Sequence, residues 1–216
     1  MLKTYNAIDY KTWNFNGKGS NILNSLFSTE KKIWEKALSH QDRRNDTGHA
    51  EVATYFALQL LNQIPEIKRN VVIPAIILHD IGYEISPDDF RKAFLSKNPD
   101  KELQKKIRLE HQVRGVVLAS QILETVKFPT QDIGEILRII ADHDTRFYDT
   151  TNNGKIVQDV DILWRFTKPC IDAYLSDKSS EEIRKISEEK DFPLLHLSVS
   201  KEIAKTELEN IMGHYK

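Results

Sequence analysis

Apolar residues recur at helical spacing along most of the chain. In the segment 49–64, Val52, Phe56, Leu60 and Ile64 stand four residues apart, which places them on one face of a helix, and Pro65 predicts where this helix ends. Similar patterns predict further helices at residues 27–40, 86–97, 101–126, 129–144, 178–190 and 198–216. Residues 146–155 are predicted to form a loop, with Asn152, Asn153 and Gly154 as turn residues.

Polar residues mark where several of these helices begin. Ser28 is the expected N-cap of the helix over 27–40, with Glu30 in its first turn, and Lys31 at the third position after Ser28 excludes a capping box. Asp46 or Thr47 is the candidate N-cap of the helix over 49–64. A turn at residues 98–100 is expected to precede the long helix that carries His111 inward.

The apolar run at residues 71–80 fits either a buried strand or a buried helix on pattern alone. Pro74 disfavours a central strand and suits the first turn of a helix. Gly82 is typical of a helix stop just past the run. Neighbouring side chains on a helix diverge by roughly 100°, so His79 and Asp80 can face one metal ion only near such a helix end.

The overall composition favours one compact domain, with residues 1–25 as an N-terminal arm and 26–216 as the domain itself. The 216 residues carry a net charge of −1, so we expect neither a nucleic-acid polymer nor a membrane as a partner. Cys170, the one cysteine, excludes an intrachain disulfide and is expected to be structural. No signal peptide or membrane span is evident, and a cytoplasmic location is expected.

Candidate metal ligands recur along the chain at intervals that suit one ligand per helix. They are His49, His79, Asp80, His111, His143 and Asp161. Imidazole nitrogen with carboxylate oxygen suits a divalent transition metal, namely Fe, Mn, Co, Ni or Zn. His49 has an alternative role as a first-turn helix residue. Asp159, two residues before Asp161 and on another helix face, is a candidate for orienting a ligand histidine.

The order of these six residues resembles the HD-domain superfamily, whose core metal signature is H…HD…D and whose binuclear branch adds two histidines. Local phrases fit as well: TGHAEVATYFALQLL, IILHDIGY, EHQVRGVVLASQIL, LRIIADHDTR and VQDVDILWRF. The resemblance covers about residues 47–166 and implies an all-α, single-domain helical bundle in which the run 71–80 is a buried helix. It also implies one or two metal ions, with Asp80 bridging, His49, His79 and Asp161 on one ion, and His111 and His143 on the other.

The implied activity is that of a phosphohydrolase acting on a nucleotide or another small phosphorylated metabolite through metal-activated water. Arg146, Arg165 and Lys168 are candidates for binding the phosphoryl group, and Arg43, Arg44 and Arg114 are further ones. Glu84 is a candidate general acid beside Asp80, although the chain lacks the HDxxED pattern of alarmone hydrolases. The GYP motif of the cyclic-dinucleotide branch is also missing, which disfavours such a substrate.

Two other functions remain open at the level of sequence. Some binuclear HD-domain proteins are mixed-valent di-iron oxygenases, and the same six ligands would serve one. A non-catalytic nucleotide sensor is the second alternative, although a pure binding module has no need of a water-activating metal. Assembly into a homo-oligomer is also left open.

Overall fold

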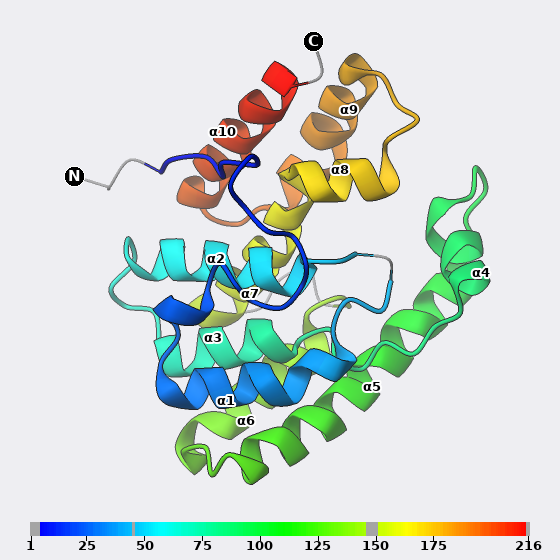
Figure 1. The fold of residues 1–216 in the computed structure, drawn as a ribbon. Helices are drawn as coiled ribbons and strands as arrows, with labels where there is room; N and C mark the ends of the chain where they lie inside the picture. The colour runs from blue at the N-terminus through cyan, green and yellow to red at the C-terminus, as the bar shows by residue number, and fades with distance from the viewer. Residues whose placement is uncertain (1–4, 45, 146–150, 215–216) are drawn as a thin grey trace.

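The computed structural model describes residues 5–44, 46–145 and 151–214, and these form ten α-helices and no strand (Figure 1). The all-α fold predicted from the sequence is therefore confirmed. The helices are α1 (Ser28–Ala37), α2 (His49–Leu61), α3 (Arg69–Leu78), α4 (Pro87–Phe90), α5 (Lys101–Thr125), α6 (Thr130–Asp142), α7 (Asn152–Leu163), α8 (Lys168–Tyr174), α9 (Ser180–Ile186) and α10 (Ser198–His214). Short 3-10 helices lie before or between them: η1 (Leu23–Ser25), η2 (Leu38–His40), η4 (Trp164–Phe166) and η6 (Phe192–Leu194). Two further elements are short π-helices: η3 (Arg91–Leu95) and η5 (Ser187–Asp191).

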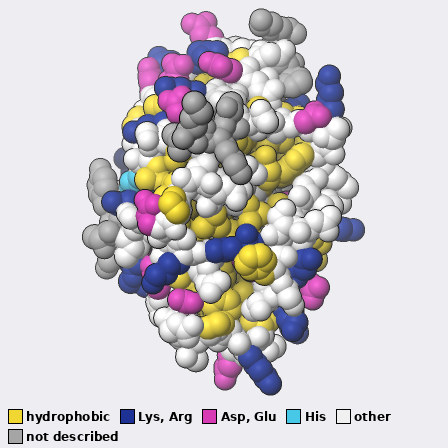
Figure 2. All heavy atoms as spheres, turned by 90° about the vertical axis from the view of Figure 1, so that its left-hand side faces the viewer, with side chains coloured by type: hydrophobic (Ala, Val, Ile, Leu, Met, Phe, Trp, Pro, Cys, Tyr) yellow, Lys and Arg dark blue, Asp and Glu magenta, His cyan; other side chains and the backbone are white. Residues whose placement is uncertain are grey.

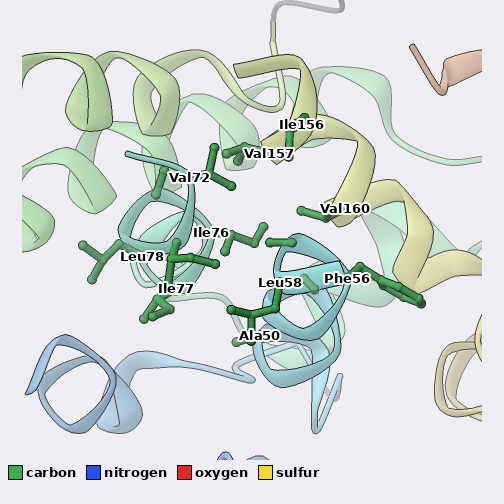
Figure 3. Packing of buried hydrophobic residues seen from close by; sticks show 14 of the residues in the cluster. Ala50, Phe56, Leu58, Val72, Ile76, Ile77, Leu78, Ile156, Val157 and Val160 are labelled. Carbon is green, nitrogen blue, oxygen red and sulfur yellow. The ribbon is translucent and has the colours of Figure 1, made fainter. Parts of the chain in front are cut away.

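Helix α3 lies at the centre of the bundle and contacts α1, α2, α6 and α7. Its residues from Val71 to Leu78 are all buried, as expected for an uninterrupted apolar run with neighbours on every side. Figure 3 shows Val72 and Ile76 of α3 packed among Val157 and Val160 of α7 and side chains of α2. The end of α3 is therefore held firmly, and the His-Asp pair follows directly after its last residue, Leu78.

Two features of the His-Asp region differ from the sequence prediction. Pro74 is the sixth residue of α3 rather than a first-turn residue, so its missing N–H lies inside the helix. Gly82 does not have the positive φ of a left-handed helix stop. Instead it lies against the backbone of α5, where an added Cβ would come within 1.9 Å of the His111 carbonyl oxygen. Close helix approach, rather than helix termination, requires glycine at this position.

Two predicted helix starts and one predicted loop also differ. Phe27 rather than Ser28 is the N-cap of α1, and its N–H donates to the Glu30 carboxylate. Gly48, with a φ of 90°, is the N-cap of α2 in place of Asp46 or Thr47. Asn152, Asn153 and Gly154 form the first turn of α7 rather than a loop, because the Thr151 side chain caps the helix by accepting from Gly154 N–H.

The N-terminal arm packs on the helical body through one buried carboxylate. Glu207 of α10 is fully buried and accepts hydrogen bonds from the Tyr5 and Tyr10 hydroxyls and from Ile8 N–H. In Figure 1 the arm accordingly runs beside α10, at the upper left of the bundle.

The surface is mixed in charge. Figure 2 shows lysine, arginine and acidic side chains interspersed over one face of the molecule, in keeping with 31 basic and 32 acidic residues in the chain. Across the part of the chain that the structure describes, none of the helices has the length and apolar character needed to cross a membrane.

Candidate metal centre

The six sequence-predicted side chains come to one place from the first residue of α2, from within α5 and α7, and from the ends of α3 and α6. His79 occupies the C-cap of α3 and His143 the C-cap of α6. Asp80 follows in the turn that Gly82 allows to approach α5. These six side chains span more than 110 residues of sequence, yet they form two groups that could hold a metal ion. The first group is His49, His79, Asp80 and Asp161; the second is Asp80, His111 and His143.

In the first group, two ring nitrogens and two carboxylates lie close together. His49 Nε2 lies 3.2 Å from His79 Nε2 and 3.0 Å from Asp161 Oδ1. His79 Nε2 lies 3.1 Å from Asp80 Oδ2 and 3.5 Å from Asp161 Oδ1. All four donor atoms thus lie within 4.8 Å of one another.

The second group uses the other oxygen of Asp80. Asp80 Oδ1 lies 3.3 Å from His143 Nε2 and 3.7 Å from His111 Nε2, and the two ring nitrogens are 3.2 Å apart. Asp80 therefore faces His79 with one oxygen and His111 and His143 with the other. A carboxylate in this position can belong to both groups at once.

Backbone carbonyls orient three of the four histidine rings. His79 Nδ1 donates to Ile76 O at 2.7 Å, His111 Nδ1 to Ile107 O at 3.1 Å, and His143 Nδ1 to Ile140 O at 2.8 Å. A proton fixed on Nδ1 leaves the Nε2 lone pair aimed at the group's centre. Lone pairs that face each other repel. A cation between the rings, or a proton on one ring, removes this repulsion. The donor set therefore fits a divalent transition metal.

Arg44 controls the charge of the shared carboxylate. Its guanidinium donates to Asp80 and Asp46 and lies 3.3 Å from His49 Nδ1. Burial opposes ionisation of Asp80, but Arg44 and then His79 outweigh it and hold its pKa well below the ordinary value. Asp80 is consequently a carboxylate, the form that a metal requires.

Burial and neighbouring charges also shift the other ligand groups. Burial opposes ionisation of Asp161, yet hydrogen bonds from His49 and His79 lower its pKa well below the ordinary value. Burial and then the nearby His143 lower the pKa of His111 to about 4. His111 is therefore neutral at physiological pH, as a metal ligand must be.

Two cavities are lined by residues of the clusters. The larger, of about 320 Å³, is lined at its inner end by Arg44, His49, Asp80 and Asp161. The smaller, of about 190 Å³, is lined by His143, Gln158, Asp161 and His196 among others. Four residues line both cavities and therefore lie where the cavities adjoin: Arg108, Asp144, Asp161 and Arg165.

The sequence-predicted substrate residues fall into three groups. Arg165 lines both cavities and pairs with Asp191 at 2.9 Å. Lys168 pairs with Asp172 and lines neither cavity. Arg146 lies outside the described residues. Of the further candidates, Arg44 reaches the cluster, whereas Arg43 and Arg114 do not line the two cavities.

Glu84 and Asp159 do not lie where the sequence hypotheses need them. The Glu84 side chain is 82% exposed, pairs with Arg114 at 3.3 Å and lines neither cavity, because the turn after Asp80 directs it outward. The Asp159 carboxylate accepts from the N–H groups of His196 and Leu197 at 2.7 and 3.0 Å. It joins α7 to the segment before α10 instead of orienting a ligand histidine.

Sequence reasoning missed three residues around the clusters. Tyr83 stacks on the His111 ring at 3.9 Å and donates to Asp144 at 3.3 Å. Asp144 also lies 3.6 Å from His111 Nε2. Arg108 precedes His111 by three residues, one helical turn, and that spacing was the available signal for it. Cys170 lines the larger cavity, but burial raises its pKa to about 12, so it is a neutral thiol.

Comparison with known protein families agrees with this geometry. The family model of the HD domain matches residues 48–165, more than half of the 216 residues, and the chain therefore belongs to the HD-domain family. HD domains bind divalent metals, and most members of the family are hydrolases. No curated protein and no solved structure matches the chain significantly.

Proposed function

We propose that this chain is a metal-dependent phosphohydrolase that cleaves a phosphoester of a nucleotide or another small phosphorylated metabolite. One observation carries the proposal: the two oxygens of Asp80 face two histidine clusters. Asp80 also lines a cavity that contains arginine side chains. The cavity volume of about 320 Å³ suits a small substrate rather than a polymer. Membership of a mostly hydrolytic family supports the same function.

In this proposal Asp80 would contribute to both ion sites, together with His49, His79 and Asp161 at one and with His111 and His143 at the other. A bound divalent transition metal such as Fe, Mn, Co, Ni or Zn would polarise a phosphoryl oxygen and acidify water, which supplies hydroxide at neutral pH. The distances between ring nitrogens, 3.2 Å in each cluster, support two ions rather than one.

The remaining residues would bind the substrate and handle protons. Arg108 and Arg165 line both cavities and would bind the phosphoryl oxygens. Arg44 stays paired with Asp46 and Asp80 and would keep Asp80 ionised. Asp144, in contact with Tyr83 and His111, would donate a proton to the leaving group in place of Glu84.

The first experiment is elemental analysis of the protein purified without chelator or nickel resin. The variant His79→Ala/Asp80→Ala is measured alongside, and His196→Ala serves as the control, because His196 lines the smaller cavity but belongs to neither cluster. We expect two metal equivalents in the parent and the control, and none in the double variant. Phosphate release from a panel of phosphomonoesters then tests the activity.

Three results would change the proposal. One equivalent of Mn, Co, Ni or Zn with phosphate release would support a mononuclear enzyme and leave His111 and His143 as cavity residues. Two equivalents of iron with O₂ consumption and no phosphate release would replace the phosphohydrolase with a di-iron oxygenase. Tight nucleotide binding without turnover under any metal would support the sensor function instead.

A further inference from the structure

The larger cavity has two chemically different ends. Its inner end holds Asp80 and Asp161, with Arg44, Arg108 and Arg165 around them. Its outer end is lined by apolar and aromatic side chains from three separate segments: Phe90, Phe94, Leu95, Tyr174, Leu175 and Ile186. A ligand that fills the cavity therefore places a charged group inside and an apolar group outside.

Three aromatic rings form a row along the outer end. The ring centroids of Phe90 and Phe94 are 5.1 Å apart with an angle of 34° between their planes. Those of Phe90 and Tyr174 are 5.9 Å apart at 40°. Phe90 thus lies between the other two, and the tilted rings resemble offset stacking more than edge-on contact.

The rings are held in place by the segments that carry them. Gln104 of α5 donates to the carbonyl of Ala93, which is fully buried between Phe90 and Phe94 in sequence. The Tyr174 hydroxyl donates to the Arg44 carbonyl at 3.1 Å, so its ring is tied to the residue that pairs with Asp80. The row of rings and the metal centre are therefore positioned relative to each other.

Arg108 connects the two ends of the cavity. Its guanidinium carbon lies 5.9 Å from the centre of the Phe94 ring. Its Nε is buried and has no hydrogen-bond partner among the described residues. A buried, unpaired guanidinium N–H is costly to leave without an acceptor, so it is a natural contact for an anionic group that enters the cavity.

On the basis of the proposed function, we infer that the substrate is a phosphoryl compound whose organic part carries an aromatic ring. The ring stacks in the row formed by Phe90, Phe94 and Tyr174, while Arg108 binds the anionic group at the inner end. Stacking adds a preference beyond the burial of apolar area alone, so an aryl group is favoured over an alkyl chain of similar size. Phe90 is the specificity-determining residue, because it lies at the centre of the row.

Binding of non-hydrolysable phosphonates to the metal-loaded protein tests this inference without relying on turnover. We would measure the Kd of phenylphosphonate, butylphosphonate and methylphosphonate by isothermal titration calorimetry. Phenylphosphonate is expected to bind about tenfold more tightly than methylphosphonate and more tightly than butylphosphonate. Phe90→Ala should reduce the preference for phenyl over methyl to about twofold or less.

Two further variants keep the test decisive if Phe90→Ala folds poorly. Phe90→Leu retains an apolar side chain and should lose the preference for phenyl over butyl. Phe27→Ala removes an exposed phenylalanine of the α1 N-cap, outside the cavity, and should change nothing.

The possible failures are distinguishable. Equal binding of all three phosphonates, or tightest binding of butylphosphonate, would overturn the aromatic substrate and leave the phosphohydrolase proposal standing. An undiminished phenyl preference in both Phe90 variants would overturn the assigned ring row. If the metal-loaded protein binds none of the three compounds, both the inference and the proposed function fail.

Discussion

At the scale of single residues, Gly82 is the position with the least room for change. A Cβ on Gly82 would lie 1.9 Å from His111 O and 2.4 Å from Gly115 N, both backbone atoms of α5. Because backbone cannot rotate away, any side chain must push the Asp80 turn and α5 apart. The contact therefore sets the separation between Asp80 and His111.

Gly82→Ala is expected to lower the free energy of unfolding by about 1–3 kcal/mol through overpacking, and to weaken metal binding by separating Asp80 from His111. Urea denaturation and elemental analysis measure the two effects. The matched control is Gly134→Ala in α6, where the added Cβ meets nothing within 4 Å. That change should stabilise the helix by roughly 0.5–1 kcal/mol. Unchanged stability in Gly82→Ala would contradict the prediction.

Arg108 supplies a second prediction at the residue scale. The Arg108 side chain lines both cavities, and its Nε has no partner among the described residues. Arg108→Ala should therefore raise KM for a phosphorylated substrate by roughly tenfold or more, which is the usual effect of losing a charge-assisted hydrogen bond. Lys106→Ala on the same helix is the control, since exposed Lys106 pairs with exposed Glu110 and lines neither cavity. Steady-state kinetics of the two variants should therefore diverge; equal KM values would remove Arg108 from the site.

At the scale of elements, α10 and the N-terminal arm depend on one side chain. Glu207 accepts from Tyr5, Tyr10 and Ile8, so truncation leaves three donors without their acceptor. Glu207→Ala should cost on the order of 3 kcal/mol and expose the arm to proteolysis. Glu202→Ala, which removes an exposed partner of Lys205 on the same helix, should cost less than about 0.5 kcal/mol. Urea denaturation and limited proteolysis compare the two, and similar losses would refute this role of Glu207.

The same carboxyl group is expected to make the free energy of unfolding depend on pH. Burial raises the pKa of Glu207 above its ordinary value, so the folded state holds this proton more tightly than the unfolded state. The resulting stabilisation is fully present below the unfolded pKa of about 4.3 and is lost as pH rises through the folded pKa. Glu207→Gln should remove this fall in stability, which denaturation at several pH values from about 4 upward would detect. An identical pH profile in the variant would show that other groups control it.

At the scale of the whole molecule, the two clusters connect five helices. Their six side chains come from α2, α5 and α7 and from the ends of α3 and α6. An ion that binds the folded chain but not the unfolded chain stabilises the fold by about 3 kcal/mol when its free concentration is near 100 times its Kd. For a chain of this size, that corresponds to a rise in Tm of roughly 5–10 °C. Chelation should lower the Tm accordingly, and metal should restore it. The variant His79→Ala/Asp80→Ala should show no metal-dependent shift; a shift equal to that of the parent would place the ion elsewhere.

Much of the candidate site was recognisable in the sequence because its signals are local or ordered. Helix periodicity at positions such as Val52 and Phe56 depends on neighbours four residues away. The His79-Asp80 pair and its partners keep the order of the family signature. These features can be recognised without knowledge of the packing. The structure brings all six candidate metal ligands together.

Other features depend on residues that are distant in sequence, and only the tertiary structure decided them. The turn after Asp80 directs Glu84 outward, and Asp159 binds the backbone before α10. The contacts of Arg44 with Asp80 and of Arg108 with the Phe94 ring exist only once folding brings these side chains together. The sequence by itself determined which residues form helices and which could bind metal. Packing between helices determined which charges and rings surround that metal centre, because such contacts have no periodic signature along the chain.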